Sequence, residues 1–128
     1  MMDQRALEGA VAHVLHLPAG DDIFAGLRRF FVEGGWTEVV IMGCAGSMEK
    51  AVVRYPQGAT LPPLVEQVEF GGAFEICTIT GNITYDNEAP RIHLHGSFAE
   101  NGAKVYGGAI GEGSKTFKSA DFFLLAYK

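Results

Sequence analysis

The sequence predicts an α+β domain: a largely antiparallel β-sheet with one main α-helix at about residues 22–33. Three observations indicate this class. Only one stretch repeats apolar residues at helical spacing. Most of the remaining chain consists of short runs rich in β-branched and aromatic residues. Glycine makes up 17 of 128 residues, about twice its usual ~7% share, and pairs of glycines stand at the ends of these runs.

The first elements are a strand and the helix. Residues 10–17 are typical of a strand, which Pro18-Ala19-Gly20 ends. Asp21 or Asp22 can then cap the helix, and Gly34-Gly35 terminates it after about three turns. One apolar face of this helix is formed by Ile23, Phe24, Leu27, Phe30 and Phe31.

From Trp36 onward the sequence pattern is typical of β-strands. A tight turn is expected at Gly43–Ser47, and a loop with three prolines at Pro56–Pro63. The predicted strands or extended runs are 37–42, 50–55, 65–70, 74–83, 91–100, 103–110 and 116–127.

Length and composition indicate one soluble domain spanning residues 1–128. The longest apolar runs are far shorter than the ~20 residues of a membrane span. The segment MMDQRALEGA lacks the apolar core of a signal peptide, so we expect a cytoplasmic protein that does not associate with membranes. In that reducing compartment Cys44 and Cys77 are expected to be buried thiols rather than a disulfide.

The net charge of −5 argues against DNA binding by this chain alone, because non-specific affinity for DNA depends on neutralising phosphates. Arg28-Arg29 and the pair Lys115 and Lys118 are short basic clusters, typical of solvated faces. The segment GAIGEGSKT has the glycine spacing of a phosphate-binding loop, but Ser114 stands where that motif requires lysine. A strand, not a helix, is expected to follow it.

The most unusual stretch is RIHLHGSF, in which His93 and His95 alternate with apolar residues. On a strand both side chains project from one face, with Cα atoms about 6.6–6.8 Å apart, and can meet one metal ion. A catalytic zinc usually has three protein ligands, so this pair alone is incomplete. The alternative is two polar side chains hydrogen-bonded on a half-buried sheet face.

Asn101-Gly102 is a strong hairpin signal, because a type I′ turn needs positive φ at both central residues. A two-residue loop would place Gly108 opposite His95 and put Ala109 on the other face. A bulge at Gly107-Gly108 would shift the register and bring Ala109 to the histidine side. The same glycines could let a ligand or a neighbouring chain approach the backbone.

These motifs resemble the plant-and-prokaryote-conserved (PPC) domain family. The resemblance covers nearly all of the chain after the first dozen residues. It rests on GGAFEICTITGNI (71–83), PRIHLHGSF (90–98), Asn101-Gly102 and Gly107-Gly108, and on LPAGDD (17–22), GCAGS (43–47) and SADFFL (119–124).

The resemblance implies a fold similar to that of acetolactate decarboxylase, and assembly as a homotrimer. Plant members carry an AT-hook and assemble with transcription factors, and some prokaryotic members hold a metal. This chain has no Arg-Gly-Arg-Pro AT-hook. It also has Ala109 where many metal-holding members have a third histidine, so no cofactor is expected and any zinc site is incomplete.

Two functions remain open. The favoured one is a non-catalytic homotrimeric interaction module, accessory to a transcription regulator. The alternative is a metal-dependent enzyme or small-molecule binder. It would use His93 and His95, with Glu75 as general acid/base unless Glu75 partners a backbone amide or Arg91. Candidate ligand-binding residues are Glu75, Arg91, Gly107 and Gly108. His13 and His16 could complete a metal site only if the fold or a neighbouring subunit brings them close.

Overall fold

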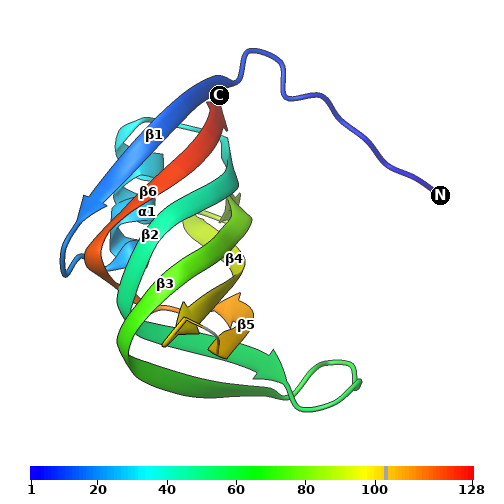
Figure 1. The fold of residues 1–128 in the computed structure, drawn as a ribbon. Helices are drawn as coiled ribbons and strands as arrows, with labels where there is room; N and C mark the ends of the chain where they lie inside the picture. Colours follow the sequence, from blue (N-terminus) through cyan, green and yellow to red (C-terminus); the bar gives the residue numbers. More distant parts are fainter. Residues whose placement is uncertain (103) are drawn as a thin grey trace.

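In the computed structural model, which describes residues 1–102 and 104–128, one helix packs against a six-stranded antiparallel sheet (Figure 1). The spatial order of the strands is β1-β6-β2-β3-β4-β5, and β2 also pairs with β5. The predicted α+β class is confirmed. The elements are β1 (Val11–Pro18), α1 (Ile23–Glu33), β2 (Glu38–Pro56), β3 (Val65–Asp86), β4 (Ala89–Glu100), β5 (Lys104–Ile110) and β6 (Lys115–Tyr127).

Helix α1 begins and ends where the sequence predicts. The side chain of Asp22 accepts a hydrogen bond from the backbone N–H of Ala25 at 2.9 Å, which caps the first turn. At the other end, the N–H of Gly34 donates to the carbonyl of Phe30 at 3.2 Å. Along one face of the helix Ile23, Phe24, Leu27 and Phe31 are buried, and this face anchors α1 to the sheet.

The predicted turn at Gly43–Ser47 is wrong, because the chain continues through it as the single long strand β2. The pairing of β2 with β6 shifts register between Ile41 and Gly43 and again between Gly46 and Met48. A Cβ on Gly46 would lie 2.3 Å from the carbonyl oxygen of Ser119 on β6. The glycine therefore serves close strand packing at a bulge and does not reverse the chain. Strand β3 likewise runs unbroken through Gly71-Gly72.

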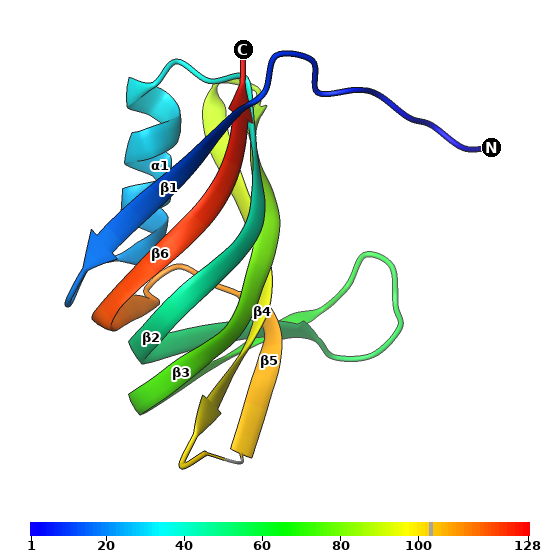
Figure 2. The ribbon, with the colours of Figure 1, turned by 45° about the horizontal axis from the view of Figure 1, so that its top comes forward.

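The core lies between α1 and the sheet that curves around it (Figure 2). Its largest fully buried side chains include Phe31, Phe74, Phe98 and Phe122. The rings of Phe74 and Phe98 meet edge to face, with centroids 5.2 Å apart. Within residues 1–102 and 104–128, no helix is both long and apolar enough to cross a membrane.

Strand β5 curls the sheet back on itself. One of its edges pairs with β4, and the other pairs Val53 with Ile110 and Arg54 with Ala109 on β2. A Cβ on Gly107 would lie 2.7 Å from the carbonyl oxygen of Gly96 on β4, and one on Gly108 would lie 3.0 Å from Cγ1 of Val53. The backbone of β4 therefore approaches Gly107, and the Val53 side chain of β2 approaches Gly108.

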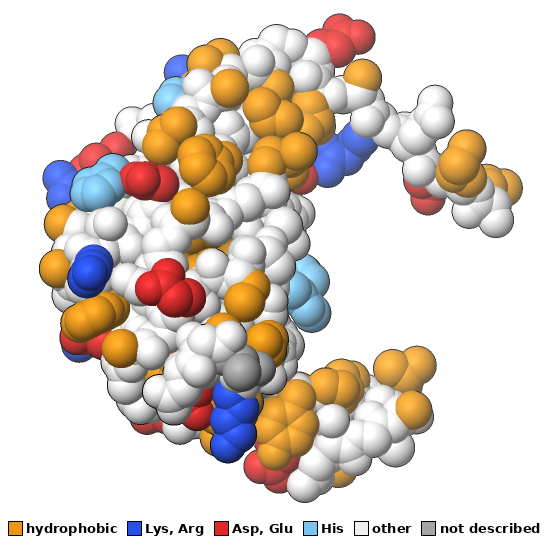
Figure 3. Space-filling view, in the orientation of Figure 1, with side chains coloured by type: hydrophobic (Ala, Val, Ile, Leu, Met, Phe, Trp, Pro, Cys, Tyr) orange, Lys and Arg blue, Asp and Glu red, His pale blue; other side chains and the backbone are white. Residues whose placement is uncertain are grey.

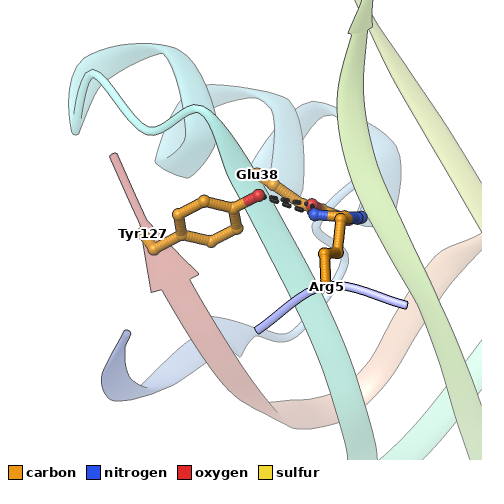
Figure 4. Close-up of polar contacts among 3 residues, drawn as sticks. All are labelled: Arg5, Glu38 and Tyr127. Atoms are coloured by element: carbon orange, nitrogen blue, oxygen red, sulfur yellow. Dashed lines mark hydrogen bonds and ion pairs between the residues drawn. The ribbon is translucent and has the colours of Figure 1, made fainter. Parts of the chain in front are cut away.

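The N-terminal segment is tied to the sheet by a buried carboxylate (Figure 4). Arg5 Nη2 donates to Glu38 Oε2 at 2.8 Å, and the Tyr127 hydroxyl donates to Glu38 Oε1 at 2.9 Å. Glu38 is only 4% exposed. The hydrogen bond from Arg5 lowers the pKa of Glu38, and the Tyr127 hydroxyl lowers this pKa further while burial opposes the shift.

Replacing Glu38 with glutamine should lower the free energy of unfolding by about 1–2 kcal/mol near pH 7, because charge-assisted hydrogen bonds are lost. A lowered carboxyl pKa gives stability that is present above the unfolded-state pKa and is lost as pH falls through the folded-state pKa. In urea unfolding, the free energies of unfolding of the wild type and of Glu38→Gln should therefore become equal at acidic pH. Glu33→Gln, which breaks only an exposed pair with Arg29, is the control. A difference that stays constant down to about pH 3 would contradict this role of Glu38.

Candidate functional site

The two histidines of β4 point to the same side of the sheet. Their Nε2 atoms are 3.0 Å apart, and both side chains are exposed. Leu94 between them is 1% exposed and belongs to the core on the opposite face. At 3.0 Å one ring nitrogen donates to the other when both rings are neutral. The period-two prediction that both imidazoles share one face agrees with this geometry.

Ala109 also lies on the histidine side, although the predicted hairpin register is wrong by one residue. Pairing begins at Glu100 with Lys104, so three residues, not two, separate β4 from β5, and Ala109 lies opposite His95. Asn101 and Gly102 have the positive φ values of 50° and 75° that the turn prediction requires. The register is constant along β5, so no bulge at Gly107-Gly108 is needed. Ala103, the predicted first residue of this strand, lies outside the described residues.

The residues beside His95 do not complete a metal site. Thr80 lies opposite it on β3, and the methyl group of Ala109 lies opposite it on β5, with Arg54 one strand further on. A methyl group cannot bind zinc, and a guanidinium in the same row repels a cation. In the described ranges 1–102 and 104–128, no group of three or more His, Cys, Asp or Glu side chains could hold a metal ion. Among these described residues, no third ligand lies beside the two histidines.

The other candidate ligands lie elsewhere. The ring of His13 packs at 5.2 Å from that of Phe30 and 5.3 Å from that of Trp36. His16 Nδ1 contacts Asp121 Oδ1 at 2.7 Å. Both histidines belong to β1, which three strands separate from β4 in the sheet order.

Glu75 is remote from both histidines and from Arg91. It pairs with Ala99, whereas the residue opposite His95 is Thr80, five positions along β3 or roughly 15 Å away. Arg91 pairs with Thr84, nine positions and roughly 30 Å from Glu75. The suggested Glu75–Arg91 partnership is therefore wrong, and no hydrogen bond of the Glu75 side chain is present among the described residues.

Three arginines line a cleft of about 850 Å³ that no motif of the sequence predicts. Arg28 comes from α1, Arg54 from β2 and Arg91 from β4, and His93 and Ala109 also line the cleft. No local motif could indicate it, because the three arginines meet only through the curl of the sheet. Arg28, predicted to belong to a solvated cluster, faces this cleft.

Comparison with known proteins identifies the family. The sequence pattern of the Plants and Prokaryotes Conserved (PCC) domain matches residues 4–127. This chain belongs to that family. No curated protein matches it. Because the solved structures below are at most 22% identical, they show the fold of this PCC domain and nothing more.

Three solved structures are similar in fold. A plant- and prokaryote-conserved protein from Pyrococcus horikoshii has a TM-score of 0.81 at 19% identity, covering 97% of this chain and 85% of its own. A protein from Bacteroides thetaiotaomicron, named for a proposed DNA-binding role, has a TM-score of 0.82 at 20% identity, covering 91% and 79%. A metal-containing protein from Archaeoglobus fulgidus has a TM-score of 0.81 at 22% identity, covering 98% and 86%.

In this PCC domain the segment with phosphate-loop spacing has a structural role. Ser114 is fully buried, and its Oγ accepts from the N–H of Val52 at 3.0 Å and donates to the carbonyl of Gly111 at 2.9 Å. The chain then enters strand β6, as the sequence predicts. The Ser114 hydroxyl is bonded to the backbone, and a strand instead of a helix follows the segment. It therefore offers a phosphate neither a free hydroxyl nor the N–H groups of a helix N-terminus.

The two cysteines of the PCC domain are free. Cys44 is half-buried, and burial, aided by the charge of Asp121, raises the pKa of its thiol to about 12. A thiol with so high a pKa is a poor nucleophile. Cys77 is exposed, so the expectation that both thiols are buried is wrong for this residue. It belongs to the bulge where the pairing of β3 with β4 shifts between Ile76 and Thr78.

Proposed function

We propose that this PCC domain is a non-catalytic interaction module of the cytoplasm that assembles as a homotrimer and serves a transcription regulator. The observation that carries the proposal is a projecting loop, residues 57–64, that holds exposed leucines away from its own core. Leu61 is 94% exposed and Leu64 is 65% exposed. Apolar side chains displayed on a projection favour burial against another chain.

The loop has a defined shape despite its exposure. The N–H of Gln57 donates to the carbonyl of Leu64 at 2.7 Å and closes the loop at its base. Gln57 Nε2 also donates to Glu66 Oε1 at 2.8 Å. Prolines at 62 and 63 restrict the backbone between these ends. A shaped loop loses less conformational entropy when it docks, which favours a specific contact.

An open strand edge adjoins the loop. Residues 65–71 of β3 pair with β2 on one side, and β4 joins β3 only from Glu75 onward. Among the described residues no strand pairs with the second edge of this stretch, and Val65 and Val68 are exposed on it. Such edges are usually covered, and a second copy of the chain offers one way to do so.

The shape of the surface favours a ring. Figure 3 shows a hollow between the N-terminal segment and the projecting loop, with histidine atoms inside it. A loop of one copy that enters the hollow of the next copy joins two different surfaces, which makes the contact heterologous. Heterologous contacts form a closed ring when the rotation between copies closes, and the trimer that the family resemblance implies is a small ring of this kind.

The test is Leu61→Asp, followed by size-exclusion chromatography with light scattering over a range of protein concentrations. A charge at a buried contact should raise the midpoint concentration for dissociation at least about tenfold, because hot-spot residues carry most of the binding energy. Leu64→Asp should act in the same direction. Val32→Asp makes the same kind of change on an exposed residue of α1 and should shift the midpoint less than about twofold.

A Leu61→Asp protein that retains the wild-type mass at every concentration would refute a trimer contact through the loop. Fluorescence anisotropy with duplex DNA tests whether the chain serves a regulator without binding DNA itself. The net charge of −5 predicts no measurable binding at physiological salt. Tight binding that weakens steeply with added salt would instead make this chain a direct DNA binder.

A further inference from the structure

The cleft lined by Arg28, Arg54 and Arg91 is positively charged, whereas the protein as a whole is negatively charged. The chain contains only 10 lysines and arginines against 15 acidic residues. Three of the ten line this one cleft, and Glu112 is the only acidic residue among its lining. With His93 neutral, the lining carries a net charge of +2 in a protein of net charge −5. Like charges gathered in a hollow raise its affinity for small anions.

Among the described residues, only one of these three arginines, Arg28, forms an ion pair. Arg28 Nη2 is held by Oε1 of Glu112 in an ion pair. In the part of the chain that the structure describes, no carboxylate lies within 4.0 Å of the guanidinium of Arg54 or Arg91. Neither side chain donates a hydrogen bond there. Both guanidinium groups therefore keep all their donors for a ligand.

Backbone packing holds Arg54 in place. A Cβ on Gly111 would lie 3.2 Å from both Cγ and Cδ of Arg54, so the missing side chain lets the arginine stem lie against the backbone. Arg54 is also fixed in register between Gln67 on β3 and Ala109 on β5. A guanidinium on a packed stem loses little entropy when it binds an oxyanion.

The remaining lining is partly apolar. Phe24, Ile92, Pro63 and Val65 contribute to it, and Tyr55 and Gln67 add polar groups. A volume of about 850 Å³ lies within the range of roughly 300–1,000 Å³ for sites that hold small molecules. An apolar wall beside two free guanidinium groups suits a ligand with a hydrocarbon part and a doubly charged end.

We propose that this cleft binds a small organic phosphate monoester, whose phosphate is held by Arg54 and Arg91. A phosphate monoester carries about −1.5 to −2 charges near neutral pH, which matches two arginines, and its oxygens suit the fork geometry of guanidinium groups. Every residue of this cleft belongs to one chain, so the cleft is complete without the trimer, although Pro63 lies in the projecting loop and Val65 on the open edge of β3.

The experiment is a titration of the purified, untagged protein with phenyl phosphate, inorganic phosphate and benzoate, followed by calorimetry and by amide NMR shifts at Gly111. Phenyl phosphate should bind saturably and more tightly than either of the others, because only it offers both a dianion and an apolar ring. Arg54→Gln and Arg91→Gln should each weaken it at least about tenfold. Arg29→Gln, on the same helix as Arg28 but outside the cleft, should change the affinity less than about twofold.

Three results would overturn the proposal: no saturable binding of phenyl phosphate up to about 10 mM, equal affinity for benzoate, or equal weakening by Arg29→Gln. Circular dichroism of each variant shows whether it folds, and Arg91→Gln provides the test if Arg54→Gln does not. The mass of each sample is recorded in parallel. An intact trimer that does not bind phenyl phosphate would contradict only the proposed anion site. A monomer that binds phenyl phosphate would contradict only the proposed trimer.

Discussion

Replacing Gly81 with alanine should destabilise the protein by about 3–5 kcal/mol, the largest stability effect that we expect from a single methyl group. Gly81 lies opposite Leu94 on β4, between the two histidines. It has a φ of 157°, and a Cβ there would lie 1.8 Å from the carbonyl oxygen of His93. Because the obstacle is backbone, relief requires β3 and β4 to separate at the centre of the sheet.

Gly71→Ala is a matched control on the same strand. A Cβ at Gly71 meets no atom within 4 Å, so this variant should change stability by less than about 1 kcal/mol. Urea unfolding monitored by circular dichroism measures both variants. Unfolding of Gly81→Ala and Gly71→Ala at the same urea concentration would contradict the close approach of β3 to β4 at Gly81.

Introducing histidine at position 109 should raise the affinity for Zn²⁺ at least about tenfold, which corresponds to roughly 1.4 kcal/mol. Ala109 lies directly opposite His95, and the Nε2 atoms of His93 and His95 are already 3.0 Å apart. Two nitrogens on one tetrahedral zinc lie roughly 3.3 Å apart, so the pair needs little movement to accept a metal. Ala109→His would supply the third protein ligand that this sequence lacks.

Isothermal titration with Zn²⁺ decides this prediction, with Val105→His as the control. Val105 is exposed on the same strand and the same face but lies opposite Ala99, four residues from position 109. A histidine there should leave zinc affinity within about twofold of the wild type, which itself should hold well under one metal per chain. Stoichiometric, tight zinc binding by the wild type would contradict this expectation. A neighbouring subunit would then have to supply the missing ligand, and a metal-dependent enzyme would become the better proposal.

Local features of this fold could be predicted, because their causes lie within a few residues. The helical spacing of Ile23, Phe24, Leu27 and Phe31 and the cap at Asp22 determine α1. The alternation around His93 and His95 places both imidazoles on one face for the same local reason. A strand needs only period two to orient its side chains.

Errors arose where distant contacts decide the structure. The glycine pattern predicts chain breaks at Gly46 and at Gly71-Gly72, yet these residues lie inside long bulged strands. Whether a glycine turns the chain or admits a neighbouring backbone depends on what packs beside it, here β6 at Gly46. The arginine cleft was missed for a related reason, since residues 28, 54 and 91 have no spacing pattern and meet only in three dimensions.

The molecular mass of the wild-type protein in solution tests the proposed homotrimeric module most directly. Light scattering coupled to size exclusion at micromolar concentration should give about 41 kDa, three times the 13.8 kDa of one chain. A stable species near 13.8 kDa would contradict the trimer, because the exposed leucines of loop 57–64 and the open edge of β3 would then face solvent in the functional protein.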